Sequence, residues 1–331
     1  MSSDLLISVS NLSRQYGSLQ AVQDLSFELR RGEVLGFLGP NGAGKSTTMQ
    51  IITGNLAPSS GQIKICGIDL LDSPGQAKAR IGYLPERPPL YRELSVDEYL
   101  LFCTQINRIP KAQRQAALKR AMQRCGLEQV GRRLINNLSK GYQQRVGIAQ
   151  AIIHSPDIVV LDEPTIGLDP IQIREIRHLI RELAHEHAVI LSTHILPEVQ
   201  MTCSRVQIIN QGRLVFSDDI GSLNRSMRAR SLILGLQQSP PPDELENLLK
   251  DIDGLESIET LEDGRWRIQH AEQQSPASRI AEKVVQNHWG LIELSPEIRS
   301  LEQIFIDITA TEQLLPESDE HPGKATEGQA A

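Results

Sequence analysis

The segment GPNGAGKST, residues 39–47, has the spacing of a loop that binds phosphate groups. Its glycines permit the backbone angles that turn successive amides toward one point, and a helix N-terminus directly after the loop adds positive potential. Lys45 would reach the β- and γ-phosphates of a nucleotide, and Ser46 would offer its hydroxyl to Mg²⁺. We predict a nucleotide site that includes the whole loop: Gly39, Pro40, Asn41, Gly42, Ala43, Gly44, Lys45, Ser46 and Thr47.

Two adjacent acids, Asp162 and Glu163, follow the apolar segment at 158–161. Neighbouring carboxylates at the edge of a core repel each other and resist desolvation, so a cation should lie beside them. Mg²⁺ on a nucleotide would supply that charge, and carboxylates are its usual protein ligands. We predict that Asp162 helps to hold Mg²⁺, directly or through water, and that Glu163 orients or deprotonates the attacking water.

The segment LSKGYQQR, 138–145, offers a second place for an anion. Ser139 can cap the helix that begins there, and Gly141 leaves an unobstructed amide beside it. A helix N-terminus with a free hydroxyl binds anions, but the chain's own nucleotide would already be held by loop 39–47. The residues alone therefore allow either an ordinary helix cap or a site for phosphate held elsewhere.

Strands and helices are predicted to alternate around these motifs. Strands are expected at 5–9, 20–29, 33–39, 157–164 and 188–194. Helices are expected at 95–106, 111–127 and 171–187. Ser95 and Glu98 form a capping box at the start of the first helix, while Asp169 and Pro170 open the last. This order predicts an α/β fold of the P-loop NTPase kind, with a mostly parallel sheet and a helical insert at about 87–140.

Beyond Gly221 the segments follow the order strand, helix, strand, strand, helix, strand, which is that of a ferredoxin-like α+β domain. They lie at 231–236, 243–250, 255–260, 265–270, 275–289 and 291–295. We predict a short helix at 301–309 and disorder over the polar residues 311–331. The expected organisation is a nucleotide-binding domain over 1–220, an accessory domain over 221–310 and a disordered tail.

Composition limits the range of partners. The 331 residues carry a net charge of −7, which disfavours a nucleic-acid backbone as the main partner. No apolar run approaches the roughly 18 residues that span a bilayer, and MSSDLLISVS lacks the basic start of a secretory signal. The cysteines lie far apart without a C-x-x-C pair, so neither a metal site nor a disulfide framework is expected. We expect a cytoplasmic chain that works at a membrane only through another polypeptide.

Six motifs in order make residues 5–220 resemble the ATP-binding cassette (ABC) ATPases. LSKGYQQR resembles the signature of that family, and it lies between the phosphate loop and the Asp–Glu pair, as in the family. The resemblance implies that Tyr16 stacks on adenine and that His194, which ends the segment STH, contacts the γ-phosphate. It also implies that Asp169, which ends TIGLD, lies at a dimer interface.

The same resemblance gives Ser139 and Gly141 a role across subunits. In the family, the signature serves the γ-phosphate of ATP that a partner subunit holds. We therefore expect a head-to-tail dimer with two composite sites, formed by two copies of this chain or by this chain and a paralogue.

Two positions depart from the family pattern. The usual LSGGQ is LSKGY here, with Lys140 and Tyr142 in place of Gly and Gln. Where the family places a Gln that touches Mg²⁺ or the attacking water, segment 81–91 offers Glu86. A carboxylate there can ligate Mg²⁺ but repels the γ-phosphate more than an amide does. Glu86 is predicted as a catalytic and metal-binding residue, and the alternative is a solvated loop acid.

LPE at 84–86, LSKGY and the ending LEQIFIDIT resemble one branch of the family. This branch contains the ATPases of type 2 exporters, including drug-resistance and gliding-motility-associated subgroups. It implies an ATP-hydrolysing, Mg²⁺-dependent subunit, peripheral to the cytoplasmic face of the plasma membrane, that drives a separate membrane permease. The permease would dock on the helical insert near Glu86, Arg87 and Tyr91, although internal packing of this loop is an alternative.

Two other hypotheses remain open. One is a soluble ABC ATPase that acts on ribosomes or DNA, although such proteins usually carry two cassettes or long coiled coils. The other is a regulator whose C-terminal domain binds a small molecule, which a ferredoxin-like domain permits but does not show.

Overall fold

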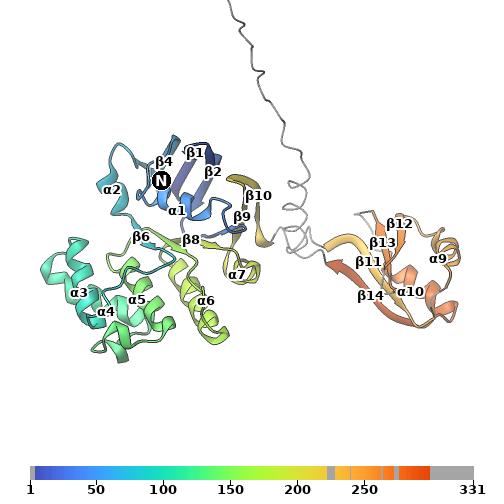
Figure 1. Ribbon diagram of the computed structural model, residues 1–331. Helices are drawn as coiled ribbons and strands as arrows, with labels where there is room; N and C mark the ends of the chain where they lie inside the picture. The colour runs from blue at the N-terminus through green and yellow to red at the C-terminus, as the bar shows by residue number, and fades with distance from the viewer. Residues whose placement is uncertain (1–3, 222–227, 239, 262–263, 272–275, 299–331) are drawn as a thin grey trace, which may run out of the picture.

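The computed structural model describes residues 4–221, 228–238, 240–261, 264–271 and 276–298. Its strands form three sheets, two in the N-terminal part of the chain and one in the C-terminal part (Figure 1). The predicted combination of an α/β nucleotide-binding fold with a C-terminal α+β unit is confirmed.

A six-stranded sheet forms the centre of the N-terminal unit. Its strands, in spatial order, are β10 (Arg213–Asp219), β9 (Arg205–Asn210), β3 (Val34–Leu38), β8 (Ala188–Thr193), β7 (Ile158–Asp162) and β6 (Ile81–Leu84). All neighbours pair in parallel except β10, which runs antiparallel to β9 at the edge. Every residue of β3, β7 and β8 is buried, as expected for parallel strands that are covered on both faces.

A four-stranded antiparallel sheet packs against this central sheet. It contains β2 (Leu19–Arg30), β1 (Leu5–Tyr16), β4 (Ser60–Ile65) and β5 (Ile68–Asp69), in that spatial order. The rings of Phe27 on β2 and Phe37 on β3 meet edge to face with centroids 5.0 Å apart. The sequence predicted the strands at 5–9 and 20–29, but not that they form a sheet of their own, because pairing depends on contacts between distant segments.

The described part of the N-terminal unit contains seven α-helices. They are α1 (Lys45–Ile52), α2 (Pro74–Lys78), α3 (Val96–Ile106), α4 (Lys111–Cys125), α5 (Lys140–Ile152), α6 (Pro170–Ala184) and α7 (Leu196–Thr202). Three of them (α3, α5 and α6) begin at a side-chain cap. The predicted capping box is present, since the Ser95 side chain accepts the Glu98 N–H and the Glu98 side chain accepts the Ser95 N–H. Asp169 caps α6 as predicted, accepting the N–H groups of Ile171 and Gln172.

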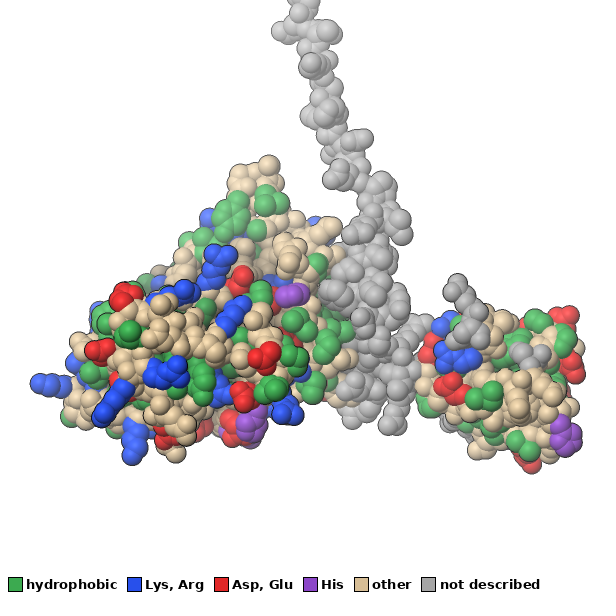
Figure 2. Space-filling model, turned by 60° about the horizontal axis from the view of Figure 1, so that its bottom comes forward, with side chains coloured by type: hydrophobic (Ala, Val, Ile, Leu, Met, Phe, Trp, Pro, Cys, Tyr) green, Lys and Arg blue, Asp and Glu red, His purple; other side chains and the backbone are tan. Residues whose placement is uncertain are grey.

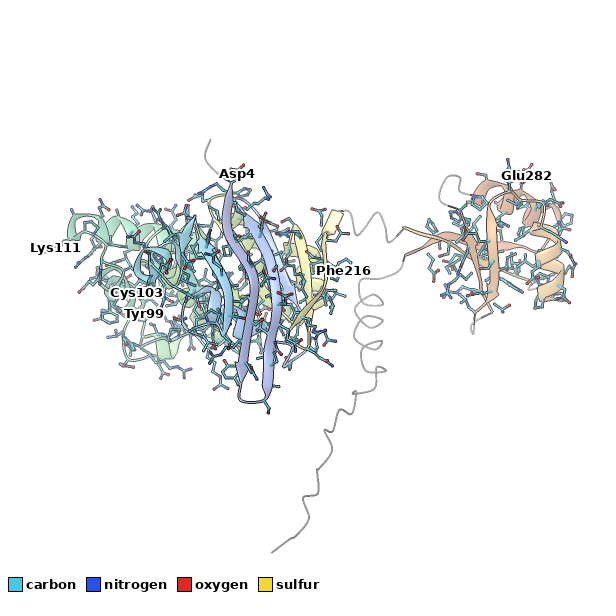
Figure 3. All side chains as sticks on the ribbon, turned by 90° about the horizontal axis from the view of Figure 1, so that it is seen from above. Asp4, Tyr99, Cys103, Lys111, Phe216 and Glu282 are labelled. Atoms are coloured by element: carbon cyan, nitrogen blue, oxygen red, sulfur yellow. The ribbon has the colours of Figure 1, made fainter. Side chains whose placement is uncertain are left out.

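The helical insert contributes to the main core through α3 and α4, and α5, which follows the insert, contributes to the same core. Tyr99 and Cys103, labelled in Figure 3, are buried on successive turns of α3. Among the described residues, no helix combines the length and the apolarity that crossing a bilayer requires.

The C-terminal unit has the predicted ferredoxin-like order. It contains β11 (Arg228–Leu236), α9 (Pro242–Leu249), β12 (Leu255–Thr260), β13 (Trp266–His270), α10 (Ala277–Gln286) and β14 (Leu291–Ile298). The antiparallel sheet has the order β12-β13-β11-β14, with the first and third strands of the unit at its centre. A core of its own forms between the sheet and the two helices. The helix predicted at 301–309 and the tail at 311–331 lie outside the described residues, and the boundary at 220–221 remains a prediction.

We predict that Leu234→Ala destabilises the C-terminal unit by about 2–5 kcal/mol, because the Leu234 side chain is fully buried and its removal leaves a cavity. Denaturant unfolding followed by hydrogen exchange at β11 and β13 measures this loss. If 1–220 is a separate domain, ATP turnover should stay near the wild-type rate. Ile292→Ala, on the same sheet but at a side chain that is 70% exposed, is the matched control. A parallel loss of stability in the six-stranded sheet would contradict the predicted division.

Candidate functional site

A cavity of about 610 Å³ brings together predicted residues from five separate segments. Tyr16 ends β1, Glu86 follows β6, Glu163 follows β7, and His194 follows β8. Because β6, β7 and β8 run parallel beside β3, their carboxyl ends meet at one edge of the sheet, where ligands of such folds bind. The remaining predicted residues in its wall belong to the phosphate loop: Asn41, Gly42, Gly44, Lys45, Ser46 and Thr47.

The phosphate loop requires glycine at two positions for different reasons. Gly44, immediately before α1, has φ +99°, and a Cβ there would lie 2.4 Å from the Ala21 carbonyl oxygen. Gly39 does not have such a φ, but a Cβ there would lie 2.3 Å from the Ile209 carbonyl oxygen. The first position therefore depends on backbone angle as well as space, and the second on close packing against β9.

Lys45 is held over this loop in a buried position. Its Nζ donates to the carbonyl oxygens of Gly39, at 2.8 Å, and of Pro40, at 3.1 Å. Burial lowers the pKa of Lys45, while the charge of Glu163 works in the opposite direction. The ammonium thus points toward the acids of the cavity from the side of the phosphate loop.

Asp162 and Ser46 fit a magnesium ion. The Asp162 carboxyl is buried at the end of β7, and its Oδ1 has no hydrogen-bond partner among the described residues. Burial raises the pKa of Asp162, and the hydroxyls of Ser192 and Ser46 beside it act in the opposite direction. A buried carboxylate oxygen without a partner, next to a hydroxyl, is suited to bind Mg²⁺ or its water, since Mg²⁺ takes few protein ligands and the oxygens of a phosphate.

Glu163 lies between two nitrogen-bearing side chains. Its carboxylate is 2.9 and 3.0 Å from His194 Nδ1, and its Oε1 is 3.8 Å from Lys45 Nζ. Burial raises the pKa of Glu163, although His194 and Lys45 both oppose this shift. A carboxyl whose pKa is shifted toward neutrality is a better proton acceptor from water than an exposed one. The φ of +48° at Glu163 is unusual for a residue with a side chain, and surrounding contacts must hold it there.

Tyr16 and Glu86 form the more open walls. The Arg14 guanidinium lies over one face of the Tyr16 ring, 4.6 Å from its centroid. Glu86 is exposed. Burial is the largest influence on the pKa of Asp162, which it raises, and of Lys45, which it lowers; the charge of Glu86 adds a smaller upward effect on each. The structure therefore places Glu86 within the electrostatic reach of the predicted metal site.

Three predicted residues lie away from this cavity. Ser139 caps α5 by accepting the Tyr142 N–H at 3.4 Å, and Asp169 caps α6. A Cβ at Gly141 would lie 2.5 Å from Gln172 Oε1, so the N-termini of α5 and α6 are neighbours. The Lys140 ammonium approaches Gly167 from the same region. The role of these residues in a partner's site stays a prediction.

The sequence did not single out three polar residues that connect the site from behind. Thr165 and Thr193 are buried, and both donate their hydroxyl hydrogens to the buried carboxylate of Glu198. Threonines beside the two motifs were visible in the sequence, but nothing there showed that an acid on the following helix faces them both.

Comparison with known proteins agrees with this geometry. Residues 22–166 match the family model described as ABC transporter. The Bacitracin transport ATP-binding protein BcrA of Bacillus licheniformis is 33% identical over 306 residues, which are 92% of this chain and 97% of that protein. The chain belongs to the ABC transporter family.

A second relative and a solved structure described as part of an ABC transporter are also similar. The uncharacterized ABC transporter ATP-binding protein YhcH of Bacillus subtilis is 32% identical, over 92% of this chain and 96% of that protein. A solved structure described as the ATP binding subunit of an ABC transporter has a TM-score of 0.60 and 32% identity, covering 66% of this chain and 92% of its own. The relatives are consistent with the predicted exporter and drug-resistance branch.

We predict that Asp162→Asn stabilises the ABC protein without nucleotide and abolishes its response to Mg²⁺. Burial raises the pKa of Asp162 above its ordinary 3.8, so the free energy of unfolding falls as the pH rises from 3.8 to the raised value and stays lower above it. At neutral pH the variant should therefore have a free energy of unfolding about 1 kcal/mol higher than the wild type, and it should lose this advantage at acidic pH. Thermal unfolding across pH, with ATP and with or without Mg²⁺, measures both effects. An unchanged Mg²⁺-dependent stabilisation would show that Asp162 does not hold the metal.

Proposed function

We propose that this chain is the ATP-hydrolysing subunit of an ABC exporter. The observation that supports it best is the placement of the buried Glu163 between Lys45 and His194 in one cavity. In this proposal Glu163 is the base, and Lys45 and His194 are the groups that contact phosphate. Asp162, the proposed ligand of the metal, lies next to Glu163, and all of them lie beside the phosphate loop. The reaction is attack of water on the γ-phosphate of ATP, with release of ADP and phosphate.

Each side chain has a separate part in this reaction. Lys45 neutralises the β- and γ-phosphates, while Ser46 and Asp162 would hold Mg²⁺, which when bound withdraws charge from the phosphate oxygens. Glu163 accepts the proton of the attacking water, and His194 contacts the γ-phosphate. Tyr16 stacks on adenine with the ring face that Arg14 leaves open. Glu86 orients the attacking water or completes the metal shell.

The composite site of a head-to-tail dimer accounts for the residues that lie outside the cavity. Ser139 and Gly141, at the N-terminus of the 13-residue helix α5, would meet the γ-phosphate held by a second copy or a paralogue. Asp169, at the neighbouring N-terminus of α6, would lie at the same interface. ATP would then close the dimer, and hydrolysis would release it.

The surface around Tyr91 suits docking of a membrane permease. The Tyr91 side chain is 48% exposed and packs against the rings of Tyr99 and Phe102 on α3. The Tyr99 hydroxyl donates to the Pro89 carbonyl, 3.2 Å away, and so ties the loop that carries Glu86 to the helical insert. A displacement of Tyr91 by a bound permease would therefore be transmitted along this loop to Glu86 in the cavity wall. The subunit would be peripheral to the cytoplasmic face of the membrane.

A soluble ATPase acting on ribosomes or DNA is supported less well. The chain is acidic overall, and basic and acidic side chains are interspersed on the face shown in Figure 2. A nucleic-acid partner would instead favour a basic patch or stripe. The name of BcrA, which refers to bacitracin transport, favours the exporter.

The proposed base is tested with Glu163→Gln. The amide cannot accept the proton, so we expect turnover of Mg²⁺-ATP to fall by about 10²-fold or more while ATP still binds and holds a dimer. Steady-state phosphate release and light scattering with ATP measure the two properties. Glu182→Gln, at an exposed acid of α6, is the control and should have no effect on either property. Normal turnover in Glu163→Gln would remove the base from this mechanism.

The exporter assignment is tested by isolating the tagged full-length chain from membranes of its own cells. We expect a protein with several membrane-spanning segments to copurify, and Tyr91→Ala to reduce its recovery several-fold because the exposed ring is lost. Leu71→Ala, at another exposed apolar side chain, should not change the recovery. Recovery with ribosomes and without a membrane protein would instead support the soluble alternative.

A further inference from the structure

Glu198 is a buried acid outside the wall of the nucleotide cavity. It lies on α7, the short helix after β8, and only 1% of it is exposed. Helix α7 packs against β3, β8 and α6 (Figure 1), so it lies behind the edge of the sheet that carries the site.

The Glu198 carboxylate joins two hydroxyls from different loops. Its Oε1 accepts a hydrogen bond from Thr165 Oγ1, and its Oε2 accepts one from Thr193 Oγ1 at 2.7 Å. Thr193 Oγ1 also accepts the Ile195 N–H at 3.1 Å, which orients its hydroxyl hydrogen toward the carboxylate. Each oxygen of the acid is therefore directed to one loop.

These two loops carry the proposed base and the proposed γ-phosphate contact. Thr165 comes two residues after Glu163, and Thr193 immediately precedes His194. Since Glu163 and His194 also contact each other, the hydrogen bonds close a ring through both loops and Glu198. A closed ring restrains the distance between Glu163 and His194 from the side away from the nucleotide.

Stability alone does not account for an acid at this position. Within the part of the chain that the structure describes, no ion pair involves Glu198. Burying a carboxylate with hydroxyl partners only is costly, and an apolar side chain would pack among β3, β8 and α6 without that cost. What an apolar side chain could not provide is two strong hydrogen bonds to two separate loops.

We propose that Glu198 is a positioning residue that fixes the Glu163 loop to the His194 loop, so that base and γ-phosphate contact move as one unit. The inference rests on the proposed role of Glu163. It explains how Glu163 is kept at its unusual φ of +48°, since the Thr165 hydrogen bond anchors the chain just after it. Without this bond the carboxylate of Glu163 is free to turn away from the attacking water.

The test is a set of variants at the three members of the network in the full-length chain. Glu198→Ala should lower kcat by about 10- to 100-fold, as a small misplacement of catalytic groups does, with KM for ATP within about threefold of wild type. Glu198→Gln, which keeps the shape and one acceptor, should recover most of this loss. Gln200→Ala, at an exposed residue of the same helix, is the control.

A double-mutant cycle separates positioning from general destabilisation. The double variant Thr165→Val and Thr193→Val removes both hydroxyls and keeps the side-chain shape, so it should lower kcat as Glu198→Ala does. Adding Glu198→Ala to it should then have little further effect on kcat. Additive losses, or a loss of kcat that follows only the loss of folded protein measured by thermal unfolding, would overturn the proposal.

The outcome can be distinguished from failure of the proposed base. If Glu163→Gln is inactive while Glu198→Ala turns over normally, the base is retained and the positioning role is wrong. If Glu163→Gln turns over normally, the proposed mechanism itself is wrong, whatever the result at Glu198.

Discussion

The structure depends on the burial of two adjacent carboxylates at the end of one strand. Asp162 and Glu163 are both nearly inaccessible, and burial raises the pKa of each. Lys45 Nζ lies 3.8 Å and His194 Nδ1 2.9 Å from the Glu163 carboxylate, whereas Asp162 feels the charge of Lys45 only weakly beside the effect of burial. Magnesium on a triphosphate would supply the charge that Asp162 still needs, so nucleotide binding and the stability of this edge are thermodynamically linked.

The sheet order makes this arrangement possible. With β3, β7 and β8 in the middle of the sheet, the phosphate loop, the acids and His194 all leave from one edge. Each of these loops begins at a strand that is buried on both faces. The start of the loop is therefore held rigidly, because every side chain of the strand is packed. The hydrogen bonds of Glu198 then restrain two of the loops that the sheet has placed next to each other.

A hydrogen bond also restrains the loop between β6 and the helical insert. The loop after β6 carries Glu86 on one side and is fastened to α3 on the other through the hydroxyl of Tyr99. The exposed ring of Tyr91, which packs against Tyr99 and Phe102, therefore lies five residues along the chain from Glu86 in the cavity wall. The C-terminal unit, by contrast, has a separate sheet and a separate core.

The sequence by itself determined the local chemistry. Glycine spacing predicted the phosphate loop, the polar residues Ser95, Ser139 and Asp169 predicted helix starts, and the strand–helix order after residue 221 predicted the ferredoxin-like unit. These features depend on residues that are close together in the chain, so the order of residues is enough to predict them. Only the tertiary structure decided that β1, β2, β4 and β5 form a second sheet, that Gly39 is required for packing against β9, and that Glu198 joins two loops. Each of these depends on segments far apart in the chain, and their contact arises only when the folded core brings them together.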